Sequence, residues 1–311
     1  MNESPTTPAL DLDLDLDPAW RGGSLTECEA CHQPIAIARG DASARCGHCG
    51  ATSSLPTAVA PDDPAPEDDL QLFDLRRSPA GIENLGERPG APRLPELRRA
   101  WEDTKSALAG PHSLADEFRA VWLAGTLGRI HGATGDPIRE RAVLEAALAR
   151  IVVPAYRALI LARLTRAAAF AGHLALAEEW LSMAPEPSGI VEIDGDVTVA
   201  RALVWLKRGR FAEVRALLGE DDEGGDFVGL ARPFADLARI EALERSGRGY
   251  PAYVLYRKAI KAHGAIPLQG LVMYYRLGVK TRRWIVGTGF AVMAVIVALL
   301  AMAWKLATWR D

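Results

Sequence analysis

The chain has 311 residues, 49% of them hydrophobic and 24% charged, so it is long enough for more than one domain and a substantial core. The net charge of −4 conceals an asymmetry, because residues 245–311 carry 11 Lys and Arg but a single acidic residue. Residues 1–70 hold 13 Asp and Glu against three Arg, which argues against phosphate binding at this end. The basic end is the one that favours anionic surfaces.

The first 24 residues are expected to form a disordered acidic arm. Asp11–Asp17 alternates Asp with Leu, but Asp is a poor strand former and Pro18 ends the run. A short docking peptide that presents three leucines is the alternative. The arm has neither a basic start nor a continuous apolar stretch, so we expect no secretory signal peptide.

All four cysteines fall in two Cys-x2-Cys pairs, Cys28 with Cys31 and Cys46 with Cys49, separated by fourteen residues. This spacing is typical of a closed tetrahedral site in which four thiolates hold a structural Zn²⁺. The string Cys28-Glu-Ala-Cys31-His32 also fits covalent haem attachment, which would place the head outside the cytoplasm. A redox-active dithiol or disulfide pair is the third alternative.

The same stretch resembles the zinc-ribbon family, and the matching residues are Cys28, Cys31, Pro34, Cys46, Cys49 and Gly50. The resemblance implies two metal-binding knuckles on β-hairpin turns over residues 25–55. Many zinc ribbons have Gly after the second cysteine, where this chain has His32. About thirty residues cannot bury enough apolar surface to fold alone, so the metal must supply the stability.

Residues 56–93 are rich in Pro and Asp and are expected to be a semi-extended linker that lets the ribbon range away from the rest. Residues 94–279 read as a series of amphipathic helices. Two helix starts are marked, one by Ser113 with Asp116 as a capping box and one by Asp136 before Pro137.

Gly135, Gly172, Gly209 and Gly247 recur at intervals of 37, 37 and 38 residues, which indicates one helical hairpin per repeat. Small and large residues that share a helical face follow the second and fourth glycines: Ala177, Leu181 and Ala184, and Ala252, Tyr256 and Ala259. This pattern resembles the second helix of tetratricopeptide repeats. The resemblance implies a mainly α fold, a tetratricopeptide-like α-solenoid; an unrelated helical bundle is the alternative.

Trp284–Trp304 is a run of 21 residues without a charge, long enough as a helix to cross a bilayer. Basic residues that would contact an anionic lipid surface precede it: Arg276, Lys280, Arg282 and Arg283. The flank and span, residues 280–304, therefore predict a tail-anchored single-pass membrane protein with a short tail, 305–311, and with its N-terminal bulk in the cytoplasm. A buried helix of a soluble protein is the alternative.

The sequence shows no HExxH pairing, no GxSxG elbow and no phosphate-binding glycine loop with Lys. We therefore expect a non-enzymatic adaptor that recruits protein partners to the cytoplasmic face of a membrane through its repeats and ribbon. A membrane-tethered regulator whose ribbon contacts nucleic acid or the transcription machinery is the alternative, although the acidic charge around the ribbon predicts no nucleic-acid partner. A haem-bearing electron carrier is a third hypothesis.

Overall fold

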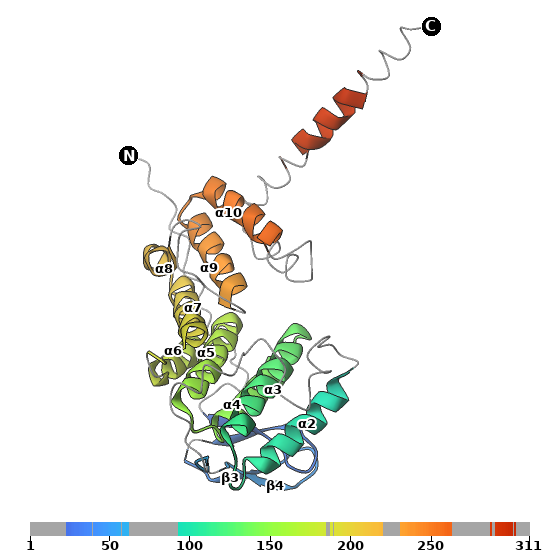
Figure 1. The fold of residues 1–311 in the computed structure, drawn as a ribbon, viewed down its shortest axis with the longest axis vertical. Helices are drawn as coiled ribbons and strands as arrows, with labels where there is room; N and C mark the ends of the chain where they lie inside the picture. The colour runs from blue at the N-terminus through green and yellow to red at the C-terminus, as the bar shows by residue number, and fades with distance from the viewer. Residues whose placement is uncertain are drawn as a thin grey trace. The chain divides into compact units, whose positions relative to one another are not determined.

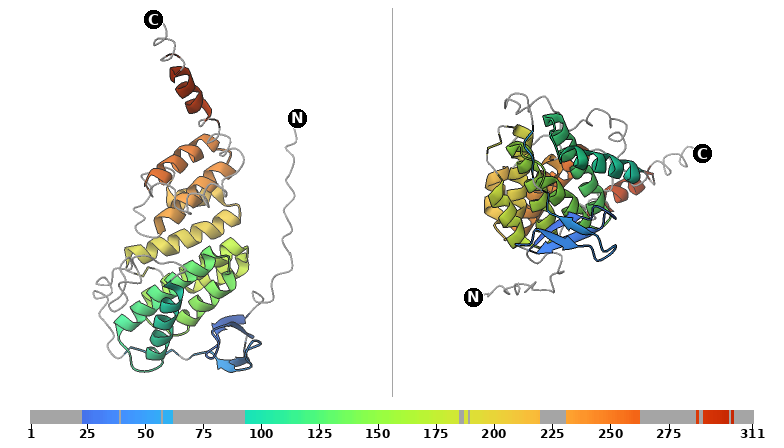
Figure 2. Two further views of the ribbon diagram at one scale, coloured as in Figure 1. Left: turned by 90° about the vertical axis from the view of Figure 1, so that its right-hand side faces the viewer. Right: turned by 90° about the horizontal axis from the view of Figure 1, so that it is seen from below.

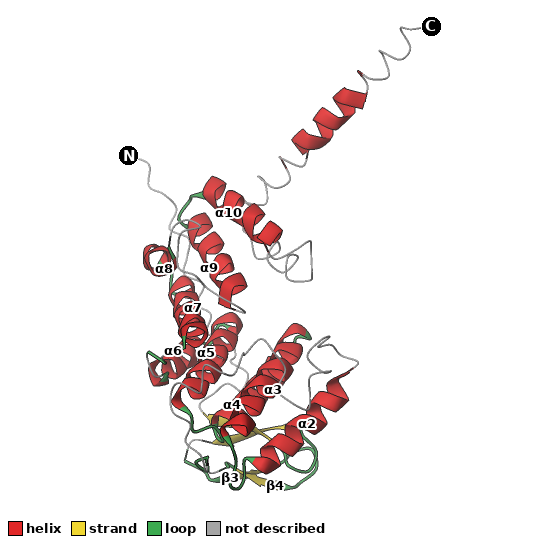
Figure 3. Ribbon diagram, viewed as in Figure 1, coloured by secondary structure: helices red, strands yellow, loops and turns green. Residues whose placement is uncertain are grey.

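The computed structural model describes residues 23–61, 93–219, 231–262 and 287–302, except positions 39, 57, 185, 186, 189, 288, 289 and 301 (Figure 1). Residues 1–22 of the expected acidic arm, most of the expected linker, the four expected lipid-contacting residues and the short tail lie outside the described residues. Gly23 and Ser24, the last two residues of the expected arm, lie in a β-strand. The chain divides into two compact units, residues 1–156 and 157–311, which are taken separately below. The fold is mainly helical, with two small β-hairpins near the N-terminus (Figure 3).

The two hairpins of the first unit form a zinc-ribbon-like module. β1 (Gly23–Glu27) pairs antiparallel with β2 (Pro34–Ala38), and β3 (Ser43–Arg45) pairs antiparallel with β4 (Thr52–Ser54). Cys28, Ile35 and Cys46 form a small core shared by both hairpins, and β2 contacts β3. Cys28 and Cys46 thus belong both to the cysteine turns and to the interior of the module.

The helices of the first unit are α2 (Leu94–Ala107), α3 (Leu114–Ala133) and α4 (Pro137–Leu148). α3 packs against both of the others, and its buried face includes Phe118, Val121 and Leu127. Both predicted helix starts are confirmed. The Ser113–Asp116 capping box is complete, and the Asp136 side chain accepts a hydrogen bond from the N–H of Arg139 at the start of α4.

The second unit contains most of α5 (Pro154–Ala171) and then α6 (Leu174–Met183), α7 (Val191–Lys207), α8 (Phe211–Leu218), α9 (Ala231–Arg245) and α10 (Gly249–Ala262). α7 contacts α6, α8 and α9, and α9 in turn contacts α8 and α10. The helices α6 to α10 therefore pack on elements near them in the chain, as the stacked ribbons of Figure 2 show. Val199, Leu203 and Val214 lie in one core cluster, and Ile240, Ala252 and Leu255 lie in the next.

The four periodic glycines end helices in the same way. Each has a positive φ, between 77° and 88°, which glycine adopts without the steric cost that a Cβ would bring. The next residue donates its N–H, over 2.9 Å in every case, to the carbonyl five residues earlier: Asp136 to His131, His173 to Ala168, Arg210 to Trp205 and Arg248 to Leu243. This is the Schellman arrangement. The following helix begins two residues after the glycine each time, so a helix–glycine–helix turn stands at each of the four predicted positions.

Residues 287, 290–300 and 302 of the expected membrane span are helical, and the rest of the span lies outside the described residues. In the part of the chain that the structure describes, no helix reaches the length and apolarity needed to cross a membrane.

Candidate metal centre

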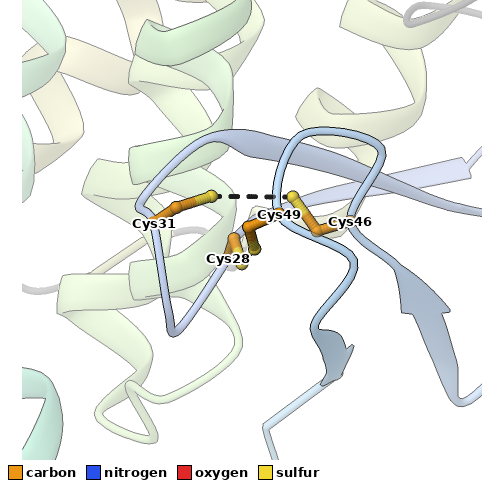
Figure 4. A group of neighbouring side chains, drawn as sticks. All are labelled: Cys28, Cys31, Cys46 and Cys49. Atoms are coloured by element: carbon orange, nitrogen blue, oxygen red, sulfur yellow. Dashed lines mark hydrogen bonds between the residues drawn. The ribbon is translucent and has the colours of Figure 1, made fainter.

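The four cysteine sulfurs converge between the two hairpins, all within 4.8 Å of one another (Figure 4). The Sγ atoms of Cys28 and Cys49 are 3.5 Å apart, and those of Cys31 and Cys46 are 3.6 Å apart. Tetrahedral coordination with Zn–S bonds of about 2.3 Å places sulfurs about 3.8 Å from each other. The arrangement therefore fits one metal ion such as zinc, and it brings together all four predicted ligands.

The two cysteine turns share one backbone design. In the first knuckle, residues 28–33, the carbonyl of Cys28 accepts from the N–H of His32 over 2.9 Å. In the second knuckle, residues 46–51, the carbonyl of Cys46 accepts from the N–H of Gly50, also over 2.9 Å. This repetition presents both pairs of thiols to a common point, as the zinc-ribbon resemblance implies.

His32 occupies a backbone position that favours glycine. Its φ is +56°, whereas Gly50, at the same place in the second knuckle, has a φ of +78°. A side chain in this left-handed region costs roughly 1–2 kcal/mol. His32 has an external contact there, since its Nδ1 lies 3.1 Å from Oε1 of Glu102 on α2. His32, which stands where many zinc ribbons have glycine, thus contacts a helix of the same unit.

Backbone amides and neighbouring thiols lower the pKa of two of the four thiols. Burial raises the pKa of Cys28, but hydrogen bonds from the N–H groups of Cys31 and Ala30 and from neighbouring thiols outweigh it and lower the pKa to about 6. The pKa of Cys46 is lowered by the N–H groups of Cys49 and His48. Each knuckle thus contains one thiol, Cys28 or Cys46, whose lowered pKa favours the thiolate, and the thiolate is the form that binds metal.

The ribbon is docked on α4 through its first strand. Arg141 donates to the carbonyl of Gly23 over 2.6 Å, and the N–H of Leu25 donates to Oε2 of Glu145 over 2.6 Å. Arg141 and Glu145 also bond to each other across one turn of α4, and both are buried. α4 thereby supplies hydrogen-bond partners to two backbone groups of β1.

α2 holds the other end of the same strand. Oε2 of Glu27, the last residue of β1, accepts from Nε1 of Trp101 over 2.7 Å and from Nζ of Lys105 over 3.0 Å. The Lys105 ammonium also lies over the Trp101 ring. The expectation that the linker lets the ribbon range away from the helices is therefore wrong, because β1 is fixed by two of them.

The sequence predicted the four clustered cysteines but not the residues that dock the ribbon. Arg141 and Glu145 look like an ordinary surface pair with i, i+4 spacing, and Trp101 looks like a core residue. The only available signal was the position of Glu27, which directly precedes the first ligand. Their role becomes visible only once residues more than 70 positions apart are placed side by side.

Comparison with known proteins gave no match: no protein-family model, no curated protein and no solved structure matches the chain.

Proposed function

We propose that the protein is a non-enzymatic adaptor, anchored in a membrane near its C-terminus, that recruits protein partners to the cytoplasmic face. The recurrence of one helical hairpin carries this proposal. Four helix–glycine–helix turns with the same hydrogen bonds punctuate the chain at nearly constant intervals. In our proposal these repeated turns belong to a tetratricopeptide-like solenoid. Solenoids of this kind present an extended surface that binds a peptide or helix of a partner.

The side-chain pattern after the glycines supports the solenoid. The fifth residue after Gly172, Gly209 and Gly247 is Ala177, Val214 and Ala252 respectively, and each is fully buried. Small residues at this position let neighbouring helices approach closely. The first hairpin departs from the pattern because Glu140, at the same position, is only half-buried.

The exposed apolar helix near the C-terminus supports the anchor. Its side chains are hydrophobic on all sides, and Phe290, Leu299 and Leu300 are each more than half exposed. Such a helix needs an apolar surrounding, which a bilayer supplies. The basic residues that precede it favour the cytoplasm for the remainder of the chain.

The metal has a structural role in this proposal. Four thiolates fill every position of a tetrahedral zinc ion, so none remains for a substrate or a reactive water. The residues that would hold the ion are Cys28, Cys31, Cys46 and Cys49. The ion would supply the folding energy that a module this small lacks.

Photo-crosslinking in cells tests the adaptor proposal. A photo-reactive residue replaces Thr198, which is half-exposed on α7, or, as a control, Asp103, which is exposed on α2 in the first unit. The proposal predicts a discrete protein adduct from position 198 in the membrane fraction and its transfer to the soluble fraction when residues 284–311 are deleted. Adducts that a nuclease removes would favour the nucleic-acid regulator. Absence of any adduct from position 198 would contradict the adaptor.

A further inference from the structure

We infer that α2 and α4 are part of the metal site, because they hold the first knuckle in the shape that binds the ion. Metal binding and the folding of residues 93–156 should then stabilise each other. The inference deepens the structural role given to zinc above and rests on it. It differs from the expectation for a zinc ribbon that does not contact the helices, because the metal affinity of such a ribbon would depend on its own thirty residues alone.

The chain is fixed by a helix both where it enters and where it leaves the first knuckle. Glu27 directly precedes the ligand Cys28 and is held on α2 by Trp101 and Lys105. Gln33 ends the knuckle, and its Oε1 accepts from Arg139 of α4 over 3.2 Å. The backbone between these two points contains Cys28 and Cys31, so the helices limit the positions that both sulfurs can take.

The side chains that hold the first knuckle on α2 lie beside its buried ligand. Cys28 is fully buried, and the Glu27 and Lys105 side chains beside it are only 12% and 9% exposed. In the second knuckle Cys46 is also buried, and both knuckles have exposed tips, Glu29 and Ala30 in the first and His48 and Cys49 in the second. The contacts of Glu27 with α2 and of Gln33 with α4, rather than burial, therefore make the first knuckle the part of the site that these helices hold in place.

Metal binding and the docking of the ribbon on α2 and α4 are thermodynamically linked, so each should stabilise the other. A metal that binds only the folded ribbon stabilises every contact that the folded ribbon makes, including those to α2 and α4. By the same thermodynamic cycle, a helix that stabilises the conformation in which the cysteines bind the metal raises the affinity of the site for the metal. Residues that orient ligands from outside the coordination sphere commonly change metal affinity by about 10- to 100-fold when they are substituted.

Competition between the full-length protein and a chromogenic zinc chelator measures the effect on affinity. W101F removes the N–H that binds Glu27 but keeps an aromatic ring in the buried site. We expect W101F to bind zinc about tenfold more weakly than the unsubstituted chain. The matched control is D103N, an exposed position two residues further along α2, which should leave the affinity unchanged.

A second variant keeps the test decisive if W101F does not fold. Q33A removes the acceptor for Arg139 from the knuckle and leaves the helices as they are, and we expect it to weaken zinc binding as well. Unchanged affinity in a folded W101F or in Q33A would overturn the inference.

Amide hydrogen exchange on the full chain tests the reverse direction. Removal of zinc by the chelator should raise exchange in α2 and α4 by about tenfold or more, while α9 and α10 keep their rates. Unaltered protection of α4 after zinc removal would overturn the inference and leave the proposed function standing. If the unsubstituted chain binds no zinc at all, the structural zinc of the proposed function fails first, and the inference fails with it.

Discussion

Arg141 and Glu145, one turn apart on α4, hold the first strand of the ribbon between them. Arg141 binds the carbonyl of Gly23, and Glu145 binds the N–H of Leu25. The two side chains also pair with each other, at 1% and 9% exposure. Burial raises the pKa of Glu145, whereas the charge of Arg141 opposes that rise. The pair therefore depends on both members, since either charge alone would be buried without compensation.

R141M should destabilise the protein strongly. It leaves the Glu145 carboxylate buried and unpaired, and breaking a buried pair in this way costs about 3–5 kcal/mol. The free energy of unfolding in urea, followed by circular dichroism, measures the loss.

R208M is the matched control for that measurement, because Arg208 pairs with Glu178 at a site where both side chains are nearly half exposed. Exposed pairs contribute about 0–1 kcal/mol. Equal losses from R141M and R208M would show that the docked pair is no more important than a surface contact.

The contribution of the Glu178–Arg208 pair to the free energy of unfolding should depend on pH. The hydrogen bond and charge of Arg208 lower the pKa of Glu178 below its usual value of 4.5. A carboxyl group with a lowered pKa in the folded state stabilises the fold above its unfolded pKa, and this contribution is lost as the pH falls through the folded pKa. The loss caused by R208M should therefore be measurable at pH 7 and fade in acid below the usual pKa. A stability loss from R208M that stays constant as the pH falls below the usual pKa of Glu178 would contradict the assigned pairing of Glu178 with Arg208.

G172A should destabilise the second unit by roughly 1–2 kcal/mol, because the φ of Gly172 is +88° and a Cβ is strained in that region. The space around Gly172 is open, so the cost comes from the backbone alone. G110A is the control, since Gly110 is also surrounded by open space but lacks a left-handed φ. It should change stability by no more than about 0.5 kcal/mol. Similar urea midpoints for the two variants would contradict the turn geometry.

C46S should abolish tight metal binding, because Cys46 is a buried member of the sulfur cluster. H48A should retain the metal, since His48 is exposed at the tip of the same knuckle. Elemental analysis of the purified variants checks both. Metal loss in H48A would mean that the histidine, and not the four thiols alone, holds the ion.

Local patterns predicted the features that depend on neighbours in the chain. Cysteine spacing predicted the sulfur cluster, and periodic glycines predicted the helix–glycine–helix turns, because each can be read from the spacing of one residue type along the chain. The docking of β1 on α4 joins Leu25 to Glu145, which are 120 positions apart in the chain. On the β1 side the hydrogen bond comes from the backbone, and backbone groups are the same whatever the amino-acid type. No residue pattern encodes such a contact. The ribbon was therefore expected to be mobile, although it packs against the helices.

Protease digestion of an N-terminal tag on the full chain, in intact and lysed spheroplasts, tests the membrane adaptor most directly. Zinc and haem are then assayed on the recovered head. Our account predicts that the tag stays protected until lysis and that the head carries about one zinc per chain. Digestion in intact spheroplasts, together with haem absorption, would contradict it and place the ribbon outside the cytoplasm.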